Sequence, residues 1–120
     1  MINPYIYSGL PVVKQAMAKL GVHHSDPENI IESTCIALDI DPLMFLSKSR
    51  KRKFVQARQL AIYFILELNP RMALTEVGRK YLGGMDHSTV IYSRNLYSDL
   101  YGRDKEFTDK ANAVKDRLML

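Results

Sequence analysis

The chain has 120 residues, 47% hydrophobic and 25% charged, which predicts one ordinary globular domain. The single cysteine, Cys35, excludes an internal disulfide, as is typical of a reduced, cytoplasmic protein. No basic leader followed by an apolar run occurs at the N-terminus, and the longest apolar stretch, residues 60–66, is far shorter than a membrane span. We therefore expect neither a signal peptide nor a membrane partner.

The positive charge is concentrated in one short segment. Six cations and no acid occur between residues 48 and 58: Lys48, Arg50, Lys51, Arg52, Lys53 and Arg58. The whole chain has 17 basic and 13 acidic residues, so the remainder is slightly acidic. A local basic cluster of this kind is typical of a surface that binds nucleic-acid phosphates. The alternatives are a solvated loop and a localisation-type basic cluster.

Apolar residues at helical spacing predict a first helix near the N-terminus. They are Leu10, Val13, Met17 and Leu20, a single stripe that stops before Gly21. We expect residues 1–25 to form a helical extension and residues 26–120 to form the main domain. The adjacent His23 and His24 would diverge on a helix and have no other metal ligand nearby, so we expect no metal site.

Two Asp-Pro pairs predict the starts of the next helices. Asp26-Pro27 precedes an apolar helix whose Cys35 we expect in the core, and Asp41-Pro42 precedes a short helix over residues 43–47. Residues 54–68 then form a long helix, nearly apolar on all sides from Leu60 onward. Such a helix is normally the buried centre of a small bundle.

A short helix, a glycine turn and a second helix follow. The first is expected over residues 75–81, capped by the hydroxyl of Thr75, and the second over residues 87–101 after Gly83-Gly84. Asp86 can cap the second helix by accepting from a free backbone N–H, which places His87, Ser88 and Thr89 in its first turn. A recognition helix presents such N-terminal residues to base edges in the major groove. The alternative is an ordinary capped surface helix.

The second helix of this pair has two faces. At 100° per residue, one face carries Val90, Ser93, Leu96, Tyr97 and Leu100, which we expect to pack. The other carries His87, Ser88, Ile91, Arg94 and Asn95, which we expect to face outward. A last amphipathic helix carries Phe107, Ala111, Val114 and Leu118. Because no run of strict alternation occurs, the predicted fold class is all-α with a helix-turn-helix.

Three segments, in the same order and at similar spacing, resemble the C-terminal DNA-binding domain of the bacterial replication initiator DnaA. Leu46-Ser47-Lys48-Ser49-Arg50 and the basic residues after it resemble the basic loop of that family. Ala57-Arg58-Gln59-Leu60-Ala61 resembles the start of its central helix. Glu76-Val77-Gly78, followed by the residues from Gly83 to Val90, resembles its signature helix-turn-helix. The resemblance covers roughly residues 28–120 and implies a small Trp repressor-like helical bundle that binds double-stranded DNA.

The resemblance also implies roles for single residues. Lys48, Arg50 and Lys51 match the loop that grips the DNA backbone, with Arg52 and Lys53 adding to its charge. Arg58 matches a residue that reaches into the minor groove. The base-reading positions are Asp86, His87 and Ser88, with Thr89 near phosphate. Arg94, on the outward face of the predicted recognition helix, is also a candidate DNA-binding residue.

Three departures from the family pattern stand out. Met85 occupies a position that is usually basic, and Ser88 replaces the more usual threonine. One extra residue lies between Gly78 and Gly84, so the angle of the helix-turn-helix is expected to differ. The chain also lacks the phosphate-binding loop G-x-x-x-x-G-K-[ST] that an initiator ATPase needs, so these residues are not a complete initiator.

Two functions remain open at this stage. The first is a stand-alone, nucleoid-associated module that prefers certain DNA sites and acts as a regulator, accessory or competitor at initiator-type sites. The second is a protein-interaction module that keeps the DNA-binding fold. A protein partner or a homodimer through the N-terminal helix is compatible with either. No arrangement of nucleophile, base and acid is apparent, so we expect neither an enzyme nor a bound cofactor.

Overall fold

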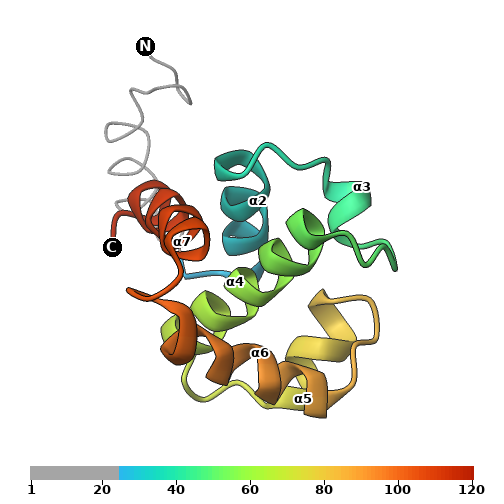
Figure 1. Cartoon of the computed structure of the whole chain (residues 1–120). Helices are drawn as coiled ribbons and strands as arrows, with labels where there is room; N and C mark the ends of the chain where they lie inside the picture. The colour runs from blue at the N-terminus through green and yellow to red at the C-terminus, as the bar shows by residue number, and fades with distance from the viewer. Residues whose placement is uncertain (1–24) are drawn as a thin grey trace, which may run out of the picture.

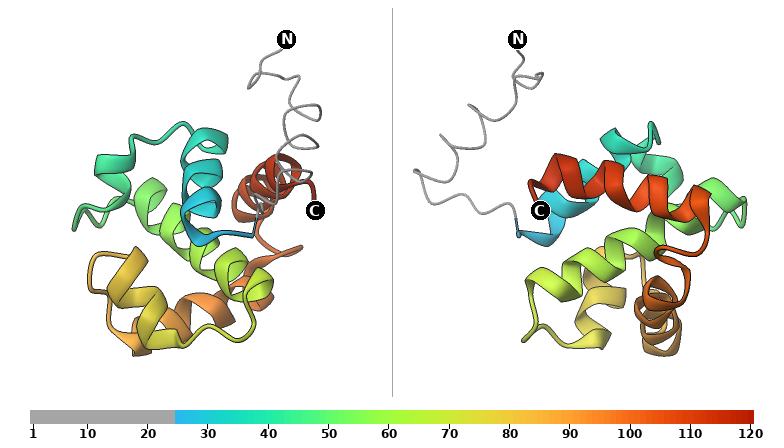
Figure 2. Two further views of the ribbon diagram at one scale, coloured as in Figure 1. Left: turned by 180° about the vertical axis from the view of Figure 1, so that it is seen from behind. Right: turned by 60° about the vertical axis from the view of Figure 1, so that its left-hand side comes forward.

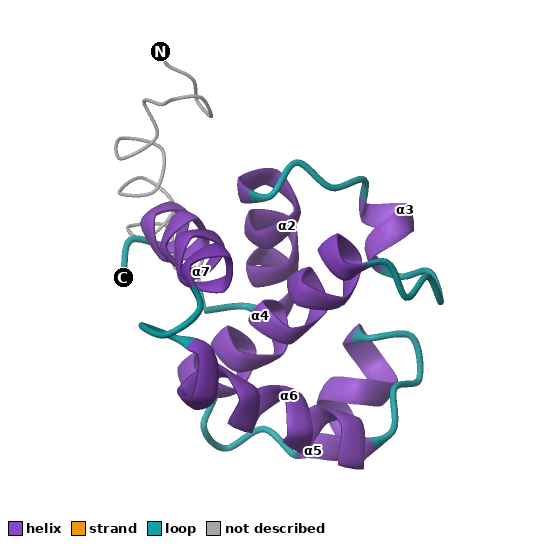
Figure 3. Ribbon diagram, viewed as in Figure 1, coloured by secondary structure: helices purple, strands orange, loops and turns teal. Residues whose placement is uncertain are grey.

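The computed structural model describes residues 25–120, and all regular structure in that part of the chain is helical (Figure 1, Figure 3). The elements are α2 (Pro27–Ala37), α3 (Pro42–Phe45), α4 (Arg52–Leu68), α5 (Leu74–Glu76), the π-helix η1 (Val77–Tyr81), α6 (His87–Leu100) and α7 (Lys105–Leu118). The predicted all-α class is confirmed. The helix expected within residues 1–25 and the pair His23-His24 lie almost wholly outside the described residues.

Helix α4 is the centre of the bundle, as its apolar sequence predicted. It packs against α2, α3, α6 and α7, and its Leu60, Ala61 and Ile65 side chains are completely buried. Figures 1 and 2 show α2 and α7 on one side of α4 and the helix-turn-helix elements on the other. The core is built mainly from these layers, because an apolar central helix is stable only when neighbours cover all its faces.

Aspartate caps begin four of the helices. Asp26, Asp41, Asp86 and Asp104 each accept a hydrogen bond from a backbone N–H of the first turn. Three of these caps were predicted, and each satisfies a donor that has no partner inside the helix. Cys35 is buried in α2, also as predicted.

The predicted boundaries differ in four places, the smallest being the end of α6 at Leu100 rather than at residue 101. The short helix α3 is Pro42–Phe45 rather than residues 43–47, and α4 begins at Arg52, two residues early. Thr75 is not a cap, because it lies inside α5, whose N-cap Ala73 makes no side-chain hydrogen bond. Helix α5, which continues into η1, therefore begins without the hydroxyl cap that the sequence predicted.

A membrane-spanning helix is not found among residues 25–120, where every helix is too short or too polar.

Candidate nucleic-acid interface

The turn between η1 and α6 is held by the backbone of Gly78. Its carbonyl accepts from the amides of Gly84 at 2.9 Å and Met85 at 3.0 Å. Gly83 and Gly84 have φ of 68° and 90°, a region that side chains with a Cβ rarely adopt, which explains the paired glycines. The helix before the turn ends in a π turn, which closes its hydrogen bonds over five residues rather than four.

The N-terminal tip of α6 has the arrangement that the sequence predicted. Asp86 Oδ2 accepts from the Ser88 amide at 3.0 Å, while Asp86 Oδ1 lies 3.8 Å from His87 Nδ1. The four residues Asp86, His87, Ser88 and Thr89 are all exposed. A capped helix end with exposed imidazole, hydroxyl and carboxylate groups offers both donors and acceptors to a ligand in front of it.

The two faces of α6 also separate as expected. Val90, Ser93 and Tyr97 are buried against the bundle, whereas Arg94 and Asn95 are exposed. Tyr97 stacks on Tyr63 of α4, with ring centroids 3.6 Å apart and planes inclined by 4°. This packing fixes the rotation of α6, and therefore which residues its outer face presents.

The basic loop, residues 46–51, connects α3 to α4. Exposure alternates along its first part: Leu46, Lys48 and Arg50 are exposed, while Ser47 and Ser49 are half-buried. Leu46 and Ser47 form a turn and a bend, and residues 48–51 have no regular secondary structure. The exposed cations of the loop are Lys48, Arg50 and Lys51.

Arg52 and Lys53 belong to the first turn of α4 rather than to the loop. Arg52 Nε lies 3.7 Å from a carboxylate oxygen of Glu106 in α7, and Lys53 Nζ lies 5.2 Å from the centre of the Phe54 ring. Both cations stay exposed. The cations of the predicted basic segment thus form two groups. One group lies in the loop, and the other lies in α4 and has protein neighbours.

Arg58 hydrogen-bonds to backbone carbonyls of the protein itself. Its guanidinium donates to carbonyl oxygens of the segment preceding α4, at 2.7 Å for Phe45, 2.8 Å for Ser49 and 2.7 Å for Ser47, with a longer contact of 3.4 Å to Met44. Burial lowers the pKa of Arg58 from its ordinary value, although a guanidinium still keeps its charge in proteins. Sequence reasoning missed these contacts because they join residues 9 to 14 positions apart.

The basic loop and the tip of α6 lie next to each other. A Cβ built on Gly83 would lie 3.7 Å from the carbonyl oxygen of Leu46, at the beginning of the basic loop. Figures 1 and 2 show the loop after α3 and the turn before α6 on the same side of the molecule. The fold thus brings together most of the predicted site residues.

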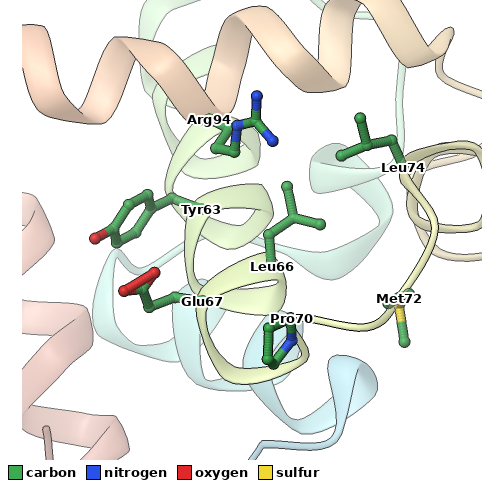
Figure 4. A pocket seen from close by; sticks show the side chains of 7 residues that line it. All are labelled: Tyr63, Leu66, Glu67, Pro70, Met72, Leu74 and Arg94. Atoms are coloured by element: carbon green, nitrogen blue, oxygen red, sulfur yellow. The ribbon is translucent and has the colours of Figure 1, made fainter.

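Arg94 lies apart from this tip. It is two helical turns beyond Asp86 and lines a pocket of about 310 Å³ between α4, α5 and α6, shown in Figure 4. Tyr63, Leu66 and Glu67 of α4 form one side of the pocket. The exposed face of α6 therefore extends from its N-terminal tip to a pocket that is lined by both apolar and charged side chains.

The structure also shows residues that sequence reasoning did not assign. Gly78 is one, since a Cβ there would collide with the carbonyl oxygen of Met85. The position of Gly78, six residues before Gly84, was the sequence signal that could have indicated this role. Arg79 and Lys80 of η1 are two exposed cations beside the turn, outside the predicted basic segment. Among residues 25–120, no group of three side chains is arranged to hold a metal ion.

Comparison with known proteins agrees with this geometry. Residues 27–95 match the family described as "Bacterial dnaA protein helix-turn-helix". The chain is similar to proteins named "Chromosomal replication initiator protein DnaA": 32% identical over 92% of its length to that of Synechococcus sp. (strain JA-2-3B'a(2-13)), and 35% identical over 83% to that of Tropheryma whipplei (strain Twist). It covers only 24% and 21% of those two relatives.

Proposed function

Since this chain belongs to the bacterial DnaA helix-turn-helix family, we propose that it binds double-stranded DNA and prefers particular sites. The family implies DNA binding rather than catalysis. The preference for particular sites, and any role in replication or transcription, are our proposals.

The observation that carries this proposal is the proximity of two surfaces with different chemistry. Lys48 and Arg50 of the basic loop are exposed, and the turn leading to the tip of α6 lies against the first residue of the loop, Leu46. Phosphate contacts position a protein on the duplex, whereas contacts to base edges select the sequence. A protein that reads the major groove needs both kinds of contact within one footprint on the duplex.

Each surface has a proposed part in binding. Lys48, Arg50 and Lys51 bind phosphates and supply most of the affinity, because displaced counterions favour binding. Asp86, His87 and Ser88 enter the major groove, where a carboxylate accepts from the cytosine amino group and hydroxyl or imidazole groups adapt to either donors or acceptors. Thr89 lies at the groove edge near phosphate.

A direct test is the fluorescence anisotropy of two labelled duplexes, one with the binding box of the initiator family and one scrambled, across a salt series. We expect the box to be preferred by about 4 kcal/mol or more, the ordinary strength of specific recognition. Equal, salt-sensitive binding would support the phosphate contacts and refute the site preference. Failure to bind either duplex at low salt would refute the function.

The biological role follows from the same sites. We propose that these residues act as a regulator, accessory or competitor at initiator-type boxes and associate with the nucleoid. The 120 residues themselves contain no phosphate loop of the form G-x-x-x-x-G-K-[ST]. Competition with a full-length initiator for one labelled box, measured by gel shift, tests this role.

A protein-interaction role has one observation in its favour. Leu43 within α3 and Leu46 directly after it have 79% and 53% of their surfaces exposed. Replacing both with serine would weaken capture of a protein partner but leave the loop cations in place. If such a variant kept its DNA affinity and lost function in cells, the interaction role would be the better one.

A further inference from the structure

The pocket between α4, α5 and α6 has an apolar part and a charged part (Figure 4). The apolar part is lined by side chains that are all half-buried: Tyr63, Leu66, Met72 and Leu74. The volume of about 310 Å³ is close to the lower end, about 300 Å³, of the range for sites that bind small molecules. The pocket is therefore suited to a small ligand that carries an apolar group.

The charged part consists of two exposed side chains of opposite sign, Glu67 of α4 and Arg94 of α6. Neither forms an ion pair within residues 25–120, and the one hydrogen bond of Arg94 in that range, from Nε to Oδ1 of Asn95, is long at 3.3 Å. Figure 4 shows the two charged groups apart from each other, on different helices. Each of them can therefore pair with a ligand group of the opposite charge.

The negative charge lies close to the aromatic side of the pocket. Burial and the charge of Glu67 both raise the pKa of Tyr63, one helical turn earlier in α4. Tyr63 in turn stacks on Tyr97 of α6, with ring centroids 3.6 Å apart. A ligand cation that pairs with Glu67 would therefore lie beside Tyr63, at the contact between α4 and α6.

We propose that this pocket binds a zwitterionic α-amino acid with an apolar side chain. The apolar side chain packs against Leu66, Met72 and Leu74, and the ammonium group pairs with Glu67. The ligand carboxylate pairs with Arg94, whose guanidinium can donate two parallel hydrogen bonds to it. This role for Arg94 differs from the DNA contact that the sequence suggested, and the proposal does not depend on DNA binding.

The test is a titration of the isotope-labelled protein, followed by the chemical shifts of its backbone amides. The ligands are L-leucine, isocaproate, which is leucine without the ammonium group, and isoamylamine, which is leucine without the carboxylate. We expect leucine to cause saturable shifts at residues 63–74 and at Arg94. Each analogue should bind about tenfold more weakly, because one charge-assisted hydrogen bond is lost.

Two substitutions assign the charges of the ligand to their partners. Glu67→Gln should weaken the binding of leucine about tenfold and leave that of isocaproate unchanged, because isocaproate has no ammonium group. Arg94→Gln should weaken the binding of leucine by a similar factor and leave that of isoamylamine unchanged. Glu32→Gln and Arg103→Gln, at exposed residues outside the pocket, are the matched controls and should bind like the wild type.

Three outcomes would overturn the proposal. The first is the absence of saturable shifts with leucine up to its limit of solubility. The second is equal binding of leucine and both analogues, which would show that the charges are not recognised. The third is binding of leucine that neither pocket substitution weakens. Because no readout involves DNA, a failure of this proposal is distinct from a failure of the proposed function.

Discussion

Met85 lies directly against Gly78, with its amide donating to the Gly78 carbonyl at 3.0 Å and its own carbonyl oxygen in the space a Cβ would need. The contact joins η1, backbone to backbone, to the residue just before the N-cap of α6. Val90 Cγ2 would lie 3.3 Å from the same Cβ, so a side chain at position 78 would also press against Val90. The angle between the helices therefore depends on a glycine at this position.

Gly78→Ala should be strongly destabilising. A methyl group there must displace backbone rather than a flexible side chain, and overpacking of this kind costs about 1–3 kcal/mol. Urea denaturation followed by circular dichroism measures the loss. Ser98→Ala, an exposed change within α6, is the matched control and should be nearly neutral. A Gly78→Ala protein as stable as the control would contradict the close contact.

Two substitutions of Asp86 should separate helix capping from base reading. Asparagine also caps helices, so Asp86→Asn should keep its stability, whereas Asp86→Ala should lose about 1 kcal/mol. Both remove a carboxylate that can accept from cytosine, so both should reduce the preference for the box by about 1–3 kcal/mol. Thermal denaturation and anisotropy measure the two effects. Unchanged preference in Asp86→Ala, which removes the acceptor altogether, would rule out base reading by this carboxylate.

Lys51→Ala should weaken binding to all duplexes by the same factor. One lost phosphate contact releases about one counterion fewer, so the slope of log affinity against log salt should flatten by about 1. The control is Lys105→Ala in α7, where Lys105 pairs with Asp109 at 2.8 Å. An unchanged slope in the Lys51 variant, or an equal change in the control, would count against the loop as the phosphate surface.

Stability should fall in alkaline solution. Burial, with the nearby charges of Asp41 and Glu32, raises the pKa of Cys35 to about 11, and burial raises that of Tyr97 to about 12. Both groups hold their protons more tightly when folded, so stability is constant below their ordinary values of 9.0 and 10.0 and is lost as pH rises through 11 and 12.

Tyr97→Phe tests the tyrosine part of this effect, because it removes the titrating hydroxyl and keeps the ring. Urea denaturation between pH 8 and pH 12 should show a shallower fall for this variant. Tyr92→Phe, at a ring that is 61% exposed, is the control and should follow the wild type. Identical curves for all three proteins would mean that Tyr97 does not contribute.

Local sequence signals were sufficient for most of the helical elements. The caps at Asp26, Asp41 and Asp86 are local, since each carboxylate bonds to an amide two residues later. The central position of α4 and the inner face of α6 followed from apolar periodicity. The tip of α6 was also predictable, because the glycine turn and the cap are adjacent in sequence. These features depend on interactions within one or two helical turns.

Contacts between distant segments were decided only by the tertiary structure. The sequence could not show that Arg58 bonds to the loop before it, or that Gly78 makes room for Met85. Nor could it show that Lys110 reaches Gln56, 54 residues away, to donate at 2.7 Å. The reason is physical: periodicity and capping report on neighbours along the chain, whereas these contacts depend on how whole helices pack. Sequence alone thus predicted which residues are candidates for DNA contact, and packing decided which of them also have partners within the protein.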